Sequence, residues 1–158
     1  MNTQLFLALT TGILSGLWAW VAVSLGLPGW VGFLGCTAWF ACPVPGFKGL
    51  LTTLGSLCSG VFWAEVIIHG STLAPYTEVA GYLMTGVVAF IMCSQARHTL
   101  LAFVPGTFIG ACATFGAQGD WRHVLPALIL GLAFGYAMKW SGQWLAHRRQ
   151  PVSYQTPE

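Results

Sequence analysis

Six apolar segments, which together take up most of the 158 residues, limit the possible folds more than any other feature of the chain. They cover, by residue number, about 5–26, 29–43, 49–68, 77–95, 100–117 and 124–146. The stretches between them are rich in Pro, Gly and polar residues, as loops are. Charged residues are only 6% of the chain, against about 25% in an average soluble domain. So few charges cannot cover a soluble surface, and the sequence predicts an integral membrane protein whose surroundings are the lipid bilayer.

The continuous apolar runs favour helices over a transmembrane barrel, whose strands alternate apolar and polar residues. We therefore predict an all-α membrane protein with six transmembrane helices. Residues 1–147 are expected to form a single transmembrane domain, and 148–158 a polar C-terminal tail. The first segment lacks the basic residues that precede the apolar part of a signal peptide, so we expect it to be retained as a span.

A neutral phrase of small and aromatic residues occurs twice, with a separation of about 75 residues. FLGCTAWFA at 33–41 is matched by FIGACATFG at 108–116, with Phe, Gly, Ala and Phe in the same order. The match predicts two three-helix repeats, about 5–70 and about 76–146. Because three is odd, the second repeat would cross the membrane inverted, as in many channels and transporters. A chance match in an apolar chain of low complexity is the alternative.

The second and fifth segments, 29–43 and 100–117, are the best candidates for a transport site. Between Pro28 and Pro43 a helix would be about 21 Å long, whereas the hydrocarbon core is roughly 30 Å thick. The fifth segment is interrupted at Pro105 and Gly106. Short or Pro/Gly-broken segments at matching positions of two halves point to a binding site. The sequence leaves open whether these segments span the bilayer fully or re-enter it.

The doubled phrase has two possible roles, to line a solute path or to pack two helices closely. The predicted path residues, with Glu65 at the outer mouth, are Cys36, Thr37, Gly110, Cys112, Thr114 and Glu65. Three G-x-x-x-G motifs predict close helix packing, since glycine lets helix backbones approach each other. They are Gly12 with Gly16, Gly106 with Gly110, and Gly131 with Gly135. The same faces predict a homo-oligomer, either a dimer or a trimer.

Glu65 and Lys139 are ionisable residues inside predicted spans, where charge is costly and often functional. The Lys139 side chain is near enough to a span end for its ammonium group to reach the interface. Glu65 lies near the other end, with His69 one helical turn later. Neither residue is at the middle of a span, which favours a pore for neutral solutes over a proton-coupled carrier.

The distribution of Lys and Arg predicts the orientation of the chain. With six spans, most of these residues lie on one side, and only Arg122 lies in a loop on the other. The residues that share the first side are Lys48, Arg97, Arg148 and Arg149. Basic loops face the cytoplasm, so both termini are expected there.

Other functions lack the residues that they require. There is no P-loop for ATP-driven transport, and the four histidines stand singly without the spacing of a metal site. No serine has the surroundings of a hydrolase triad, and the net charge of +2 forms no patch for nucleic acid. The five cysteines include no C-x-x-C pair and are expected to be packing residues. We therefore expect no enzymatic activity, no cofactor, no metal and no nucleic-acid partner.

The doubled phrase, together with GDWRH at 119–123, resembles the YcdZ-type family of bacterial inner-membrane proteins. The resemblance covers about residues 5–145. It implies a multi-pass protein of the bacterial inner (plasma) membrane, in a domain family of unknown function, and it supplies neither a substrate nor a functional residue.

The leading functional hypothesis is a channel or facilitator for a small uncharged solute. One alternative is a structural or regulatory membrane subunit without its own transport pathway. A second alternative is a proton- or cation-coupled exporter of small molecules.

Overall fold

The computed structural model describes residues 3–72 and 78–148, and the secondary structure in these two ranges is entirely helical. The helices are α1 (Thr3–Ser24), α2 (Gly29–Ala41), α3 (Gly46–Thr72), α4 (Glu78–Ser94), η1 (Gln95–Arg97), η2 (Thr99–Leu101), α5 (Val104–Gly116) and α6 (Trp121–Arg148). Three of them, α1, α3 and α6, are long and apolar enough to cross a membrane. The prediction of an all-α protein is confirmed, and three of the six predicted spans are candidate membrane spans by their length and composition.

Prolines set the ends of the two short helices. Helix α2 has 13 residues, begins directly after Pro28 and ends before Pro43. Helix α5 also has 13 residues, and Pro105 lies in its first turn. The missing N–H of proline has no helical partner at that position in any case, so proline starts this helix rather than breaking it. The expected interruption at Pro105 and Gly106 is therefore the beginning of α5, and the preceding residues 99–101 form η2.

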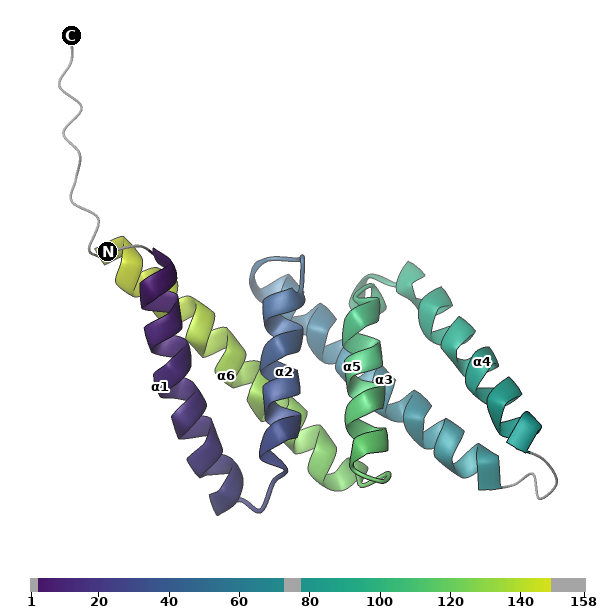
Figure 1. The fold of residues 1–158 in the computed structure, drawn as a ribbon. Helices are drawn as coiled ribbons and strands as arrows, with labels where there is room; N and C mark the ends of the chain where they lie inside the picture. The colour runs from purple at the N-terminus through teal and green to yellow at the C-terminus, as the bar shows by residue number, and fades with distance from the viewer. Residues whose placement is uncertain (1–2, 73–77, 149–158) are drawn as a thin grey trace, which may run out of the picture.

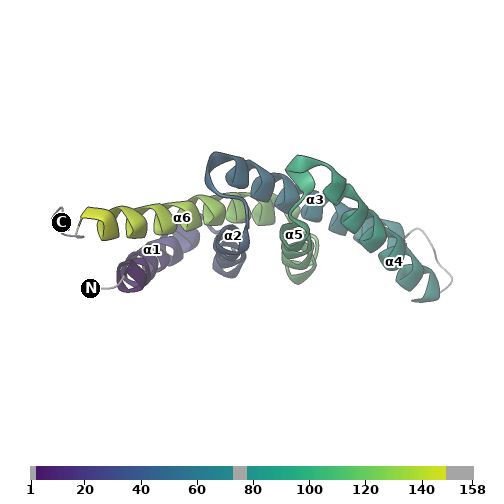
Figure 2. The ribbon, with the colours of Figure 1, turned by 90° about the horizontal axis from the view of Figure 1, so that it is seen from above.

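The six α-helices form a broad layer rather than a closed bundle (Figures 1 and 2). The long helices α3 and α6 run obliquely on one side of the layer, and the short helices α2 and α5 stand side by side on the other. Helix α2 packs against α6, and α5 packs against α3. Helices α1 and α4 occupy the two edges, where α1 lies along α6 and α4 along α3.

The layer has two ends, which we name by their loops. The 42–45 end, at the top of Figure 1, also holds η1, η2 and the first turn of α5. The 117–120 end, at the bottom, also holds the loop from α1 to α2.

Small and hydroxyl residues are buried between the helices, while large apolar side chains cover the outside. Thr53, Thr107 and Thr114 are 0% exposed, whereas Phe90 is 72% exposed and Val23 is 82% exposed. This distribution is opposite to that of a soluble protein and is typical of helices packed together in lipid. Trp18 is 0% exposed, and its indole N–H donates to the Gly29 carbonyl at 2.9 Å.

Candidate functional site

The repeated phrase on α2 has two different faces. Gly35 and Ala38 are buried, and a Cβ atom added at Gly35 would collide with the backbone of α6 at Leu128. Phe33 and Phe40 lie on the opposite face and are 43% and 37% exposed. Glycine on one face therefore allows the two backbones to touch, while the aromatic face stays outside.

Helix α5 repeats the same division. Gly110 and Ala113 are buried, and a Cβ atom at Gly110 would collide with the Leu57 carbonyl of α3. Phe108 and Phe115 are 40% and 41% exposed. The second copy of the phrase thus packs on a different long helix and leaves equivalent aromatic rings exposed.

A small polar residue stands between the two phenylalanines on each exposed face. On α2 it is Thr37, whose hydroxyl donates to the Phe33 carbonyl at 2.9 Å, and on α5 it is Cys112. The spacing i, i+4, i+7 keeps each set of three on one side of its helix. We call the six residues the central stripe: Phe33, Thr37, Phe40, Phe108, Cys112 and Phe115.

Contacts at the 117–120 end fix the relative depth of the two helices. The Trp30 ring lies against Gly116, where an added Cβ atom would be 2.7 Å from it, so the start of α2 is level with the end of α5. With a helical rise of about 1.5 Å per residue, Phe33 and Cys112 stand at nearly the same depth. Thr37 and Phe108 are likewise nearly level, about 6 Å further along the layer. The central stripe therefore offers one aromatic and one small polar residue at each of two levels.

Three of the predicted path residues lie between helices instead. The Cys36 thiol donates to the Gly131 carbonyl at 3.0 Å, and the Thr114 hydroxyl donates to the Gly110 carbonyl at 3.0 Å. Cys36 and Thr114 are buried, and Gly110 faces α3 as described above. The structure thus brings Thr37 and Cys112 to the exposed side and places Cys36, Gly110 and Thr114 where helices meet.

The three G-x-x-x-G motifs have different surroundings. Gly131 and Gly135 face the backbone of α2, and Gly106 lies against the Phe103 ring. Gly12 and Gly16 lie on an exposed face of α1, with nothing within 4 Å of an added Cβ atom.

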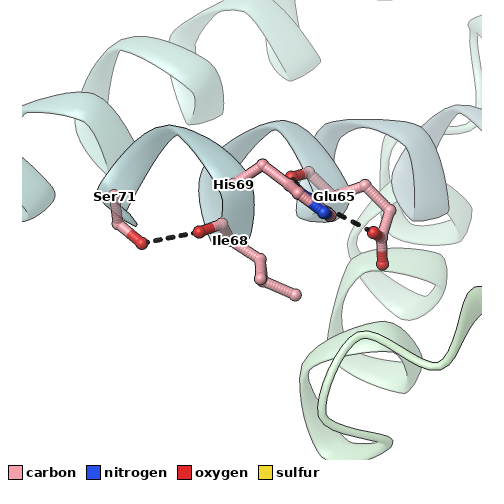
Figure 3. Close-up of polar contacts among 4 residues, drawn as sticks. All are labelled: Glu65, Ile68, His69 and Ser71. Carbon is pink, nitrogen blue, oxygen red and sulfur yellow. Dashed lines mark hydrogen bonds and ion pairs between the residues drawn. The ribbon is translucent and has the colours of Figure 1, made fainter. Parts of the chain in front are cut away.

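Glu65 lies on α3, apart from the central stripe and near the loop from α5 to α6. Its Oε2 atom is 3.4 Å from His69 Nδ1 (Figure 3), and its Oε1 atom is buried without a hydrogen-bond partner. A Cβ atom at Gly119, in the loop from α5 to α6, would lie 3.5 Å from Oε1. The side chain borders a cavity of about 340 Å³, lined by Cys58, Val61, Phe62, Glu65, Trp121 and Leu125.

The sequence reasoning missed a polar network around Gln95. The Gln95 Oε1 atom accepts from the Ser59 hydroxyl at 2.9 Å and from the Trp63 indole at 3.0 Å. The Gln95 amide donates to the Thr107 hydroxyl at 3.3 Å. Gln95 was expected only as a loop residue, and the one available signal was the i, i+4 spacing of Ser59 and Trp63 on one face of α3. This network ties η1 to α3 and α5.

Within residues 3–72 and 78–148, no group of three or more His, Cys, Asp or Glu side chains could hold a metal ion. An all-helical layer with lipid-type surfaces and several apolar helices defines the class: a multi-pass α-helical membrane protein.

The chain belongs to the family described as "Protein of unknown function (DUF1097)", which it matches over residues 8–143. It is 67% identical to "Inner membrane protein YcdZ" of Salmonella typhimurium over 156 residues, which cover 99% of this chain and 98% of the relative. It is 64% identical to "Inner membrane protein YcdZ" of Escherichia coli K12, with 100% and 97% covered. "Uncharacterized protein YahC" of Escherichia coli K12 is 27% identical, with 92% and 94% covered. The expected YcdZ-type family is thus confirmed, and no solved structure matches the chain.

Proposed function

We propose that the chain is an inner-membrane channel or facilitator for a small uncharged solute, with its path along the central stripe. The inner membrane is the location given in the names of the two YcdZ relatives. The observation that carries the proposal is the stripe itself. It repeats an aromatic, small polar, aromatic order on the exposed faces of the two shortest α-helices, where a path across the membrane would be shortest.

Two inverted repeats are part of this proposal. Suppose that α1, α2 and α3 correspond to α4, α5 and α6. The contact of α2 with α6 then has its equivalent in the contact of α5 with α3, and the contact of α1 with α6 in that of α4 with α3. All four contacts are present. The correspondence supports the interpretation that all six helices cross the membrane, with the second repeat inverted.

A second copy would complete the path. The stripe residues are exposed in one chain, so a single copy cannot enclose a path along them. We propose a parallel homodimer in which α2 of each copy faces α5 of the other. Parallel copies agree with the distribution of Lys and Arg, which also favours cytoplasmic termini.

The chemistry of the stripe favours an uncharged solute. It contains four phenylalanine rings, one hydroxyl and one thiol, and no charged group that would compensate an ion in a dry path. A hydroxyl and a thiol offer a passing neutral molecule one hydrogen-bonding step at each of the two levels. The proposal assigns no catalytic step, cofactor or metal to the chain.

One observation favours the membrane-subunit alternative. Gly35 and Gly110 are used for close helix packing, so the doubled phrase has a structural role whether or not a solute passes. In that case the central stripe would be covered by another membrane protein. The buried Glu65 Oε1 atom is the observation that favours a coupled exporter, which would lose its activity in Glu65→Gln.

Stopped-flow light scattering on proteoliposomes tests the proposal. Vesicles are challenged with water, glycerol, urea, acetamide, formate and ammonium in turn, and faster re-swelling than in empty liposomes identifies the solute. Thr37→Leu fills the path and should lower this rate to that of empty liposomes. Thr85→Leu is the matched control, because Thr85 is also exposed and its hydroxyl also donates to the carbonyl four residues earlier, at 2.9 Å. Equal rates for folded protein and empty liposomes with every solute would refute the channel.

A further inference from the structure

A second cavity, of about 260 Å³, lies at the 42–45 end of the layer, opposite the Glu65 cavity. It is formed where the end of α2 and the start of α3 approach the second half of α6. The lining residues are Trp39, Pro45, Gly46, Tyr136, Lys139, Trp140 and Gln143. Unlike the residues of the central stripe, most residues that line this cavity have side chains with N–H or O–H groups.

Trp39 supplies a donor that has no acceptor. The residue is only 5% exposed, and its Nε1 atom is buried without a hydrogen-bond partner. The indole ring packs against the Tyr136 ring, with 5.4 Å between their centroids. A buried N–H group without a partner is costly, and a turn of the Trp39 ring toward the cavity would let a bound acceptor remove that cost.

Lys139 supplies a positive charge at the same place. Its Nζ atom lies over the Trp39 ring, 5.6 Å from the centroid. The ion pairs among the described residues join Glu65 with His69 and Asp120 with His123, and none includes Lys139. Among the described residues, neither of those two acidic side chains lines this cavity.

The start of α3 adds a third source of positive potential. Gly46 lines the cavity and is the first residue of this 27-residue helix, whose first turn holds no acidic residue. The first N–H groups of a helix have no helical acceptor and carry the positive end of the helix dipole, so they attract anions.

We propose that this cavity binds a phosphate group. The ammonium of Lys139, the indole N–H of Trp39 and the first turn of α3 would together neutralise and hydrogen-bond a compact anion. The Gln143 amide offers a further donor. Such a group reaches the cavity either as the headgroup of an anionic phospholipid or as free phosphate, and basic pockets between helices on one side of a membrane suit the former.

The 75-residue offset of the repeat explains why this site occurs once in each chain. This offset relates Tyr136 and Trp140, which line the cavity with Lys139, to Val61 and Glu65, which line the Glu65 cavity. The two cavities are therefore equivalent positions in the two halves, with a lysine at one end and a glutamate at the other. A phosphate group suits only the cavity with the lysine.

Isothermal titration of delipidated, full-length protein in detergent tests the site. Three ligands are titrated: short-chain phosphatidylglycerol, short-chain phosphatidylcholine and inorganic phosphate. Phosphatidylglycerol binding that exceeds phosphatidylcholine binding identifies a lipid headgroup site, and saturable binding of inorganic phosphate identifies a site for the free anion. Lys139→Gln should lower the affinity for the ligand that binds by at least about tenfold, as expected for loss of a charge-assisted hydrogen bond. Lys139→Arg should retain the affinity.

Two further variants make the test specific. Trp39→Phe keeps an aromatic ring under Lys139 but removes the orphan N–H, and should also weaken binding by about tenfold. Lys48→Gln is the matched control, because it removes a lysine from the first turn of α3 that does not line the cavity. The proposal is overturned if none of the ligands binds, if phosphatidylcholine binds as well as phosphatidylglycerol, or if Lys139→Gln and Lys48→Gln have equal effects. If one of these variants does not remain monodisperse, Gln143→Ala is measured in its place and should also lower the affinity.

Discussion

Substitution of Gly110, where α5 contacts α3, tests the observed helix packing most directly. A Cβ atom at this position would collide with the Leu57 carbonyl, which is backbone and cannot move aside alone. Gly110→Ala must therefore push α5 away from α3, and such overpacking costs about 1–3 kcal/mol. The alanine regains about 1 kcal/mol from its better helix propensity, which leaves a net loss of about 0–2 kcal/mol.

Gly16→Ala on α1 is the matched control. The substitution is the same and the position is helical, but nothing lies within 4 Å of the added Cβ atom. Only the propensity gain applies, so this variant should be as stable as the wild type or slightly more stable. The free energy of unfolding is measured by titration with SDS in mixed micelles, followed by circular dichroism. Unfolding of both variants at the same SDS fraction would contradict the close contact between α5 and α3. Gly110→Leu, a larger change, should lose assembly before any transport effect can be measured.

Two further predictions concern the dimer and the Gln95 network. In a Cys93→Ser background, Phe33→Cys should form a disulfide-linked dimer with Cys112 of the partner subunit, because Phe33 and Cys112 are nearly level and α2 would face α5. Leu83→Cys, on an exposed face of α4, should stay monomeric on non-reducing gels, and equal crosslinking of the two variants would exclude the proposed interface. Gln95→Leu removes the acceptor of two hydrogen bonds and should lower the free energy of unfolding by about 1–2 kcal/mol, whereas Gln4→Leu, at an exposed position of α1, should leave it unchanged.

The helical class and the limits of most helices could be predicted from the sequence, because long apolar runs between Pro- and Gly-rich loops allow few structures in lipid. The prediction was weakest where one proline has two possible effects. Pro105 starts α5, although the same residue inside a helix would have broken it. Which applies depends on whether the preceding residues are helical, and the apolar character of Leu100 and Leu101 concealed the change to η2.

The candidate site was predictable in position but not in orientation. The periodicity of the doubled phrase separates Phe33 and Thr37 from Gly35, yet all three are acceptable either to lipid or to a neighbouring helix. In a soluble protein, polarity would have shown which face points outward, whereas in a membrane both faces are apolar. For this reason the predicted path residues include some from the exposed face of each short helix and some from its buried face. Gln95 could not be predicted, because its partners come from α3 and α5, which only the fold brings together.

The two faces of the phrase explain why it occurs twice without charge. Its glycine face has the same role on both short helices, because Gly35 and Gly110 each let a short helix approach the backbone of a long one. The halves differ instead in the end cavities, with Lys139 in one and Glu65 in the other. Charge asymmetry of this kind can orient a protein in the membrane, but it lies away from the stripe. The stripe contains no Asp, Glu, His, Lys or Arg that could couple solute passage to a proton or cation, which favours a passive facilitator over a coupled exporter.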